Sequence, residues 1–502
     1  MLLLGIDIGT SSVKVSVVDS STQKVMASAQ YPDEESPIIA LQPGWAEQSP
    51  EMWWQHTQHA IELCNSKFKY NPLDIAAIGI AYQMHGLVLV DKEQNVLRNS
   101  IIWCDSRAVE IGDEAFEEIG EAHCLAHLLN SPGNFTASKL AWVKKNEPQL
   151  YDRIDKVMLP GDFIAMKFTG EVTTTVAALS EGIFFDFKNN RLSKDIINYF
   201  GFDELLFPEV KPVFAEHGQL TALVAEKLRL KPGIPVAYKA GDQPNNALSL
   251  NVLNTGEVAA TAGTSGVIYG VSDQLTCDQQ SRVNTFAHVN YTQEQKRLGV
   301  LLCINGAGSM YRWTKSIFGA SENYSQMNSK ARQAPLGSEG LFVLPFGNGA
   351  ERMLNNKIVG THMHNINLNI HTQAHMFRAV QEGIAFAFRY GLDIMRSNGM
   401  NPTVIRAGKN NLFLSELFAE TFVNITGVPV ELYKNDGSTG AALGAGIGAG
   451  IFSTPAQAFT NIHPLQLIEP STSQLEPIYQ EWKSLLEKQL MGQAYEDHSL
   501  VN

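Results

Sequence analysis

The chain has 502 residues, which is long for one hydrophobic core and predicts two or three domains. Hydrophobic residues make up 44% of the chain and charged residues 18%, a composition that predicts a globular α/β protein and excludes a long disordered tract. The net charge of −13, without a cluster of Lys and Arg, excludes nucleic acid as the main partner.

The first residues and the cysteines bear on the cellular compartment. Residues 1–7 lack a basic region and lead directly into an apolar strand, so we expect no signal peptide. A run of about eighteen apolar residues does not occur, and we expect no membrane partner. The five cysteines are widely spaced and form no CxxC pair, which favours reduced thiols in the cytoplasm.

The first half of the chain begins with a predicted meander of strands. The strands are predicted at residues 2–8, 13–18 and 25–30. Ser49 before a proline and a glutamate is typical of a helix start. An apolar strand over residues 75–81 then ends in the polar loop 82–86, and a strand resumes over residues 87–90. Ligands of α/β proteins bind at such strand ends, so we expect this loop to line a site.

The second half repeats this order of elements, which predicts two lobes with a cleft between them. Its strands are predicted at residues 258–262, 267–271, 300–304 and 403–407, with a long helix at 374–395 and another helix from about Phe413. We place the boundary within residues 250–256, giving lobes of residues 1–253 and 254–502. The small residues at 440–450 predict close helix packing rather than a dinucleotide site, and no P-loop motif occurs.

A five-residue turn occurs twice with one change, at residues 9–13 and 263–267. Each copy lies between an apolar run and a β-rich run, which predicts two similar hairpins. A Gly-Thr-Ser turn exposes successive backbone N–H groups and hydroxyls, so the pair predicts two phosphate-binding nests. Asp7 precedes the first turn by two residues, whereas Thr261 stands at the matching place before the second.

Asp242 is the strongest candidate for a chemical role. It follows an apolar run and a glycine and precedes a predicted helix, and an ordinary helix-capping role is the alternative. Phosphoryl transfer to an alcohol needs phosphate nests, a carboxylate for Mg²⁺ and a base for the hydroxyl proton. The two turns, Asp7 and Asp242 supply these parts, and Lys14 adds positive charge nearby.

Residues 83–86 and 103–107 offer amide, imidazole, carboxylate and guanidinium groups beside an indole, a mixture that suits a polyol. The alternatives are a core role for His85 and a simple ion pair between Asp105 and Arg107. The late histidines are not predicted to bind zinc, because they form no HExxH motif and no cysteine cluster joins them. These histidines are His362, His364, His371 and His375.

Together these motifs resemble the FGGY carbohydrate kinases over roughly residues 1–450. The matching stretches are residues 5–11, 83–86, 103–107, 241–242, 263–267 and 407–408. The resemblance implies two ribonuclease H-like lobes of the actin, hexokinase and Hsp70 ATPase type, with ATP and Mg²⁺ as cofactors. The Gln-Met-His-Gly stretch resembles the members that phosphorylate D-xylulose to D-xylulose 5-phosphate, rather than those acting on glycerol, gluconate or ribulose.

The resemblance also implies roles for individual residues. Asp242 is implied as general base on the C5 hydroxyl, and Asp7 as Mg²⁺ ligand. The sugar is expected to contact Gln83, Met84, His85, Trp103, Asp105, Asp242 and Gln243. The nucleotide is expected to contact Thr10, Ser11, Gly263, Thr264, Ser265, Gly308, Gly408, Lys409 and Asn410.

Two departures from the family pattern leave alternatives open. Gln243-Pro244 stands where Asn-Ala is common, which leaves L-ribulose, L-fuculose or another ketose as substrates. Ala407-Gly408-Lys409 replaces three glycines, which leaves the adenine contacts open. An ATP-binding sugar sensor on the same fold is a further alternative, although such a module needs no base at Asp242. A homodimer also stays open, as do regulation and the role of residues 480–502.

Overall fold

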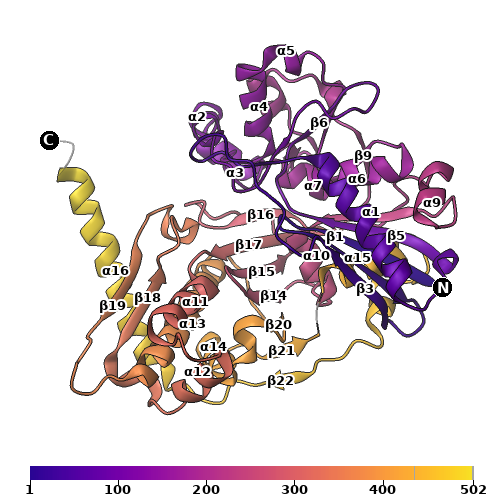
Figure 1. The fold of residues 1–502 in the computed structure, drawn as a ribbon. Coiled ribbons are helices and arrows are strands. Elements are labelled where there is room, and N and C mark those ends of the chain that lie inside the picture. Colours follow the sequence, from indigo (N-terminus) through magenta and orange to yellow (C-terminus); the bar gives the residue numbers. More distant parts are fainter. Residues whose placement is uncertain (435, 500–502) are drawn as a thin grey trace.

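The computed structural model describes residues 1–434 and 436–499. Two lobes, each built around a β-sheet, lie one above the other in Figure 1. Among the described helices, none combines the length and the apolarity needed to cross a membrane. The chain ends in a helix over Leu475–Ser499, and residues 500–502 lie outside the described part.

The first sheet has five strands in the order β13-β5-β1-β2-β3. Its strands are β1 (Leu2–Ile8), β2 (Val13–Asp19), β3 (Val25–Tyr31), β5 (Ile75–Tyr82) and β13 (Val236–Gly241). β1, β2 and β3 form the predicted antiparallel meander, and β5 runs parallel to both β1 and β13. Because β1, β5 and β13 are parallel, their carboxyl ends meet at one edge of the sheet.

The second sheet has seven strands in the order β16-β17-β15-β14-β20-β21-β22. Its strands are β14 (Glu257–Ala262), β15 (Gly266–Ser272), β16 (Asn284–Ala287), β17 (Leu298–Ile304), β20 (Val404–Gly408), β21 (Val430–Tyr433) and β22 (Gln466–Ile468). The central run β17-β15-β14-β20-β21 repeats the order and directions of β3-β2-β1-β5-β13. The predicted similarity of the two halves is therefore confirmed.

Helices and short strands surround these sheets. The helices of the first lobe are α1 (Pro50–Lys67), α2 (Val109–Ile119), α3 (Glu121–His127), α4 (Thr136–Asn146), α5 (Pro148–Tyr151), α6 (Pro160–Thr169), α7 (Val176–Glu181), α8 (Lys194–Phe200), α9 (Ala222–Leu228) and α10 (Asp242–Ser249). The later helices are α11 (Ala307–Phe318), α12 (Tyr324–Ala331), α13 (Gln373–Ser397), α14 (Glu416–Thr426), α15 (Gly437–Gly448) and α16 (Leu475–Ser499). Short strand pairs are β4 (Glu47–Gln48) with β7 (Ser100–Ile101), β6 (Val88–Val90) with β8 (Lys156–Met158), β9 (Thr173–Thr175) with β12 (Glu209–Lys211), β10 (Phe185–Asp186) with β11 (Arg191–Leu192), and β18 (Phe342–Phe346) with β19 (Gly360–His364).

Capping residues explain where helices begin. Ser49 caps α1, since its side chain accepts a hydrogen bond from the Met52 backbone N–H, and Pro50 is the first helical residue. The helix predicted from about Phe413 begins instead at α14. Residues 411–414 form a 3₁₀ turn there, and Ser415 caps α14 by accepting from the Phe418 N–H.

The small-residue helix α15 lies directly on the first sheet, beside β1 in Figure 1. A Cβ atom on Gly5 of β1 would lie 1.8 Å from the Ser438 carbonyl oxygen, and one on Gly79 of β5 would lie 2.0 Å from that of Ala441. Likewise, a Cβ on Gly444 would lie 2.6 Å from the Tyr238 ring. The predicted close packing of this stretch is confirmed, and glycine is needed on both surfaces.

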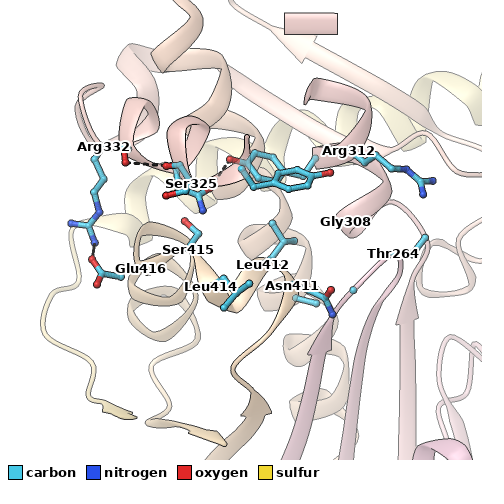
Figure 2. A pocket seen from close by; sticks show the side chains of 16 residues that line it. Thr264, Gly308, Arg312, Ser325, Arg332, Asn411, Leu412, Leu414, Ser415 and Glu416 are labelled. Carbon is cyan, nitrogen blue, oxygen red and sulfur yellow. Dashed lines mark hydrogen bonds and ion pairs between the residues drawn. The ribbon is translucent and has the colours of Figure 1, made fainter. Parts of the chain in front are cut away.

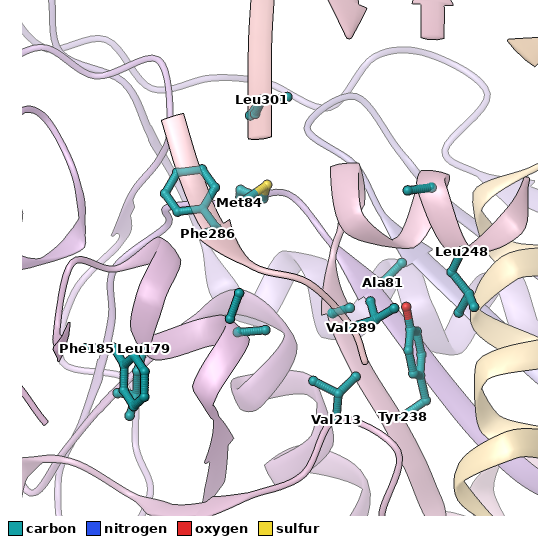
Figure 3. Close-up of a cluster of buried hydrophobic side chains, with 14 of the residues drawn as sticks. Ala81, Met84, Leu179, Phe185, Val213, Tyr238, Leu248, Phe286, Val289 and Leu301 are labelled. Carbon is teal, nitrogen blue, oxygen red and sulfur yellow. The ribbon is translucent and has the colours of Figure 1, made fainter. Parts of the chain in front are cut away.

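A hydrophobic cluster joins the lobes (Figure 3). Met84 of the first lobe belongs to the same buried cluster as Phe286 and Leu301 of the second sheet. Tyr238 and Leu248 of the first lobe belong to it as well. α15 comes late in the chain and packs on the first sheet. The division at residues 253/254 stays a prediction.

The contact between α15 and the sheet predicts a severe effect for Gly79→Ala. The new methyl group would lie 2.0 Å from a backbone oxygen that cannot move aside without shifting α15. We expect a loss of about 1–3 kcal/mol or more in unfolding free energy, seen as a lower melting temperature.

Gly492→Ala is the matched control, because Gly492 lies within α16 and a Cβ atom on it would meet nothing within 4 Å. We expect this change to leave the melting temperature unchanged or to raise it, since Ala favours helix by about 1 kcal/mol over Gly. Equal melting temperatures for both variants would contradict the packing argument.

Candidate active site

The carboxyl ends of β1, β5 and β13 bring the first candidate residues together. Asp7 pairs with Ala81 in the register of β1 and β5, and Gly241 pairs with Tyr82 in that of β13 and β5. Asp7, the loop that follows Tyr82, and Asp242 at the start of α10 therefore leave the sheet along one edge. The predicted position of Asp242, at a strand-to-helix junction, is confirmed.

Asp7 and Asp242 influence each other electrostatically. Burial, and then the charge of Asp7, raises the pKa of Asp242 to about 7, although hydrogen bonds from Gln243 oppose the change. Burial, and then the charge of Asp436, raises the pKa of Asp7 to about 6, with Lys14 acting in the opposite direction. The site therefore holds more negative charge than its nearby cation balances, an arrangement that favours a bound cation or proton.

Asp436 is a part of this site that the sequence analysis missed. Its side chain caps α15 by accepting from the Ser438 N–H at 3.0 Å, and it also forms an ion pair with Lys14. At the next residue, Gly437, a Cβ atom would lie 2.1 Å from the Asp7 Oδ2 atom. The start of α15 thus lies against the Asp7 carboxylate. An aspartate just before the Gly-Ser-Thr start of a helix was the available signal.

His85 is held in one defined tautomer. It lies in the left-handed region with φ +62°, and its Nδ1 donates to the Glu181 carbonyl oxygen at 3.0 Å. Burial, followed by the charge of Lys139, lowers the pKa of His85 to about 3, so the ring is neutral at pH 7. Its Nε2 atom is therefore an acceptor. The ring packs edge-on against Phe135, with centroids 4.8 Å apart.

Two buried charged residues, both missed by the sequence analysis, support the His85 loop. Lys139 donates from its Nζ to the carbonyl oxygens of His85 and Ile102, at 2.9 and 3.0 Å. Glu181 accepts from the His85 N–H at 3.3 Å, and burial raises its pKa well above the usual value. A single acid in the otherwise uncharged residues 172–185 was a signal for Glu181.

A hydrogen-bond network links the first turn to two more candidates. Thr10 donates from Oγ1 to Gln83 Oε1 at 3.2 Å and accepts from Trp103 Nε1 at 2.9 Å. The Gln83 amide nitrogen donates to Gln48 Oε1 at 3.1 Å, so both polar atoms of Gln83 have protein partners. Trp103 is 54% exposed and presents its indole to solvent. Ser11, at the tip of the same turn, is exposed as well.

Asp105 does not point into an open site, which corrects its expected contact with sugar. Its side chain is fully buried and accepts from the Ala46 N–H at 2.5 Å. Arg107 donates to the same carboxylate from Nε at 3.0 Å and from NH2 at 2.7 Å, while its guanidinium lies 3.8 Å from the Trp45 ring centroid. Of the two interpretations of Asp105, the structure shows the ion pair with Arg107.

The second turn borders a cavity of about 710 Å³ (Figure 2). Gly263 accepts at its carbonyl oxygen from the Gly308 N–H at 2.9 Å, and Thr264 accepts from the Ser309 N–H at 3.0 Å. A Cβ atom on Gly308 would lie 2.2 Å from the Gly263 oxygen, so glycine is required at this contact. The turn is thereby fixed against the start of α11, and Gly263, Thr264 and Gly308 all line the cavity.

The far wall of the cavity combines two aromatic rings with polar side chains. Tyr311 donates to Asn328 Oδ1 at 2.7 Å, and its ring stacks on that of Tyr324 with centroids 5.7 Å apart. Arg332 and Glu416 form an ion pair at 2.9 Å, seen at the left of Figure 2.

The predicted residues are only partly present in the lining. The lining includes Asn411, whereas Ser265, Gly408, Lys409 and Asn410 are absent from it. Lys409 donates instead to Gln466 Oε1 at 3.0 Å.

Comparison with known proteins is consistent with this geometry. The N-terminal domain model of the FGGY family of carbohydrate kinases matches residues 2–249, and the C-terminal domain model matches residues 258–451. A xylulose kinase of Escherichia coli (strain K12) is 29% identical over 482 residues, which cover 94% of each chain. The crystal structure of a "xyloylose kinase" from Brucella ovis has a TM-score of 0.87 and 26% identity, covering 97% of this chain and 98% of that one.

A gluconate kinase from Lactobacillus acidophilus has a TM-score of 0.88 at 20% identity, covering 97% of this chain and 98% of that one, and shows the fold alone. The expected two-lobe fold of the actin, hexokinase and Hsp70 type is confirmed. The two family domains match in order and together span most of the sequence. The chain therefore belongs to the FGGY family of carbohydrate kinases.

Proposed function

We propose that this carbohydrate kinase transfers the γ-phosphoryl group of ATP to the C5 hydroxyl of D-xylulose, giving D-xylulose 5-phosphate. The observation that carries the proposal is the pair of interacting carboxylates, Asp7 and Asp242, on one edge of the first sheet. Support for the sugar comes from the similar proteins of Escherichia coli and Brucella ovis, whose names give xylulose kinase and xyloylose kinase.

Asp242 is the general base in this proposal. Its raised pKa of about 7 makes it a stronger proton acceptor than an ordinary aspartate, while a large part of the population stays ionised at neutral pH. As the hydroxyl oxygen attacks phosphorus, its proton passes to the Asp242 carboxylate. The chain supplies this base on a helix start, so the carboxylate is held by the rigid β13–α10 junction.

The sugar contacts follow from the groups left free around Asp242. His85 Nε2 is an unprotonated acceptor for one sugar hydroxyl, and the exposed Trp103 ring offers a face for C–H groups. Met84 lies beside Gly241, where a Cβ would be 2.6 Å from its Cγ. Gln243 contributes an amide next to the base, whereas Gln83 acts through Thr10 and Trp103.

The residues around Asp7 fit a magnesium ion. Mg²⁺ is bound by one or two carboxylates together with substrate phosphates. Asp7 is a carboxylate whose pKa is raised to about 6 by burial and then by the charge of Asp436, so a bound cation would favour its ionised form. Asp7 would hold the ion directly, and the ion pair of Lys14 with Asp436 would lie beside it. When bound, the ion neutralises charge on the transferring phosphoryl group. At the first turn, the exposed Ser11 hydroxyl and the backbone N–H of Thr10 would donate to the phosphates, since the Thr10 hydroxyl donates to Gln83.

The cavity of the second lobe is the proposed place for the nucleoside and its phosphates. Gly263 and Thr264 line this cavity next to the start of α11, where the helix dipole favours anions. A contact of Ser265 with the phosphates stays a prediction. The Tyr311 and Tyr324 rings and Leu412 give the cavity an apolar wall for a base. Roles for Gly408, Lys409 and Asn410 stay predictions, and Asn411 joins them as a lining residue.

Replacing the base tests the proposal directly. Asp242→Ala should lower kcat by about 10²–10⁴ while leaving ATP affinity largely unchanged, because the group acts on the sugar proton. Asp113→Asn is the control. Asp113 is an acid on the solvent-facing side of α2, and its pKa is also raised, by partial burial of its carboxylate and then by the charge of Glu117. Turnover by the Asp242 variant near the wild-type rate would refute the role of Asp242.

The raised pKa of Asp242 also predicts how its replacement changes stability with pH. A carboxylate whose folded pKa lies above its unfolded value destabilises the fold as pH rises through the folded value, here about 7. In Asp242→Asn this penalty is absent. We therefore expect a higher melting temperature than wild type at pH 8 with EDTA present, and a difference that shrinks towards pH 5. A constant difference across this range would contradict the raised pKa.

Substrate identity is best tested by ADP release across a panel of sugars. The panel contains D-xylulose, L-ribulose, L-fuculose and glycerol, together with a reaction that lacks sugar. We expect the highest kcat/KM with D-xylulose and little ADP release without an acceptor. A higher kcat/KM with another ketose would replace the proposed substrate but keep the kinase. ADP release that no sugar increases would contradict the transfer reaction itself.

A further inference from the structure

A cluster of two histidines and an aspartate lies outside the proposed active site. His123 and His127 are one helical turn apart on α3, and Asp195 comes from the first turn of α8. One potential ligand atom from each lies within 4.8 Å of the others. In the part of the chain that the structure describes, this is the only such group of histidine, cysteine and acidic side chains. The proposed reaction uses none of the three.

His127 is oriented as metal-binding histidines commonly are. Its Nδ1 lies 3.1 Å from both carboxylate oxygens of Asp186. A carboxylate only accepts, so Nδ1 carries the proton and Nε2 keeps a free lone pair in the neutral ring. Asp186 is itself buried and fixed by the Lys188 and Asn189 N–H groups, at 3.0 Å each. A carboxylate behind a histidine in this way fixes the ring and makes it a better metal ligand.

His123 completes the cluster with Asp195. Its Nε2 lies 2.9 Å from Asp195 Oδ2, and its ring stacks on that of His127 with centroids 4.2 Å apart. Side chains that are 45% and 40% exposed, for His123 and Asp195, allow an ion to reach the cluster from solution. In this arrangement His123 Nε2 donates a hydrogen bond to the Asp195 carboxylate, and an ion bound at this nitrogen would replace that proton.

We propose that His123, His127 and Asp195 bind a zinc ion, with water in the fourth position. Two imidazoles and one carboxylate form a donor set that suits Zn²⁺ and disfavours Mg²⁺, which takes oxygen ligands. The site is therefore chemically distinct from the proposed magnesium position at Asp7. Bound zinc would join α3 to α8, two helices that no other described ion pair connects.

Other histidine pairs of the chain show what this cluster has in addition. His371 and His375 have the same spacing, but His371 Nδ1 accepts from the Asn367 N–H at 3.0 Å. His375 Nδ1 accepts from the Thr372 N–H at 3.2 Å, and its Nε2 lies 3.2 Å from the Glu339 carboxylate. The spacing of two histidines alone therefore does not separate the pairs. What separates them is the ring nitrogen that faces the carboxylate. In His127 it is Nδ1, which leaves Nε2 for a metal, whereas in His375 it is Nε2 itself.

The experiment measures the affinity of the EDTA-stripped protein for Zn²⁺ by competition with a chromogenic zinc indicator, in the presence of excess Mg²⁺. We expect one zinc ion per chain, with binding weakened at least about 10-fold in His123→Ala and in Asp195→Asn. His371→Ala is the control with matched spacing and should bind zinc like wild type. Unchanged zinc affinity in both cluster variants, or loss in the control, would overturn the site.

A second measurement uses the wild-type protein, so its result cannot be caused by misfolding of a variant. Anomalous diffraction at the zinc edge from zinc-soaked crystals of the wild-type protein should give a peak between α3 and α8, within about 2.0–2.2 Å of histidine nitrogen and aspartate oxygen. A zinc peak found only elsewhere, or no peak, would contradict the proposal. Its failure would leave the kinase reaction untouched, because no residue of the cluster belongs to the proposed active site.

Discussion

The close contact between α15 and the first sheet is the constraint on which the rest of the site depends. Glycines on both surfaces let the helix backbone touch β1 and β5, where any side chain would collide with main-chain atoms. This contact brings the start of α15 against Asp7 and places Asp436 where its charge raises the pKa of Asp7. Packing between residues more than 400 positions apart in the sequence therefore sets the electrostatics of the site.

The two lobes share one topology but differ in chemistry. Each sheet contains a run of three antiparallel strands followed by two parallel ones, with a Gly-Thr-Ser turn between β1 and β2 in the first and between β14 and β15 in the second. The first turn follows Asp7, whereas Thr261 stands before the second and accepts a hydrogen bond from Asn246 of α10. Phosphates bound between the lobes need hydrogen-bond donors from both lobes. The metal ion and the proton transfer need carboxylates from one lobe only. The difference between Asp7 and Thr261 matches that division of roles.

Much of this architecture could be predicted from the sequence because it depends on local patterns. Short apolar runs marked the strands of the meanders, Ser49 marked a helix start, and the repeated turn indicated the related halves. What could not be predicted depends on distant packing. Asp105 looked like a sugar ligand until its burial against Arg107 was known. The roles of Lys139 and Glu181 depend on carbonyl groups and charges that only the fold brings close to them.

The proposed reaction requires that Asp242 face the acceptor hydroxyl while Asp7 faces the metal. A crystal structure with D-xylulose, Mn²⁺ and a non-hydrolysable ATP analogue tests both at once, because manganese is located by its anomalous signal. If Asp242 is the base and Asp7 the metal ligand, the C5 hydroxyl will lie within about 2.6–3.2 Å of the Asp242 carboxylate, and the manganese peak will lie beside Asp7. A sugar bound with another hydroxyl at Asp242, or a metal held by Asp242 instead of Asp7, would contradict it.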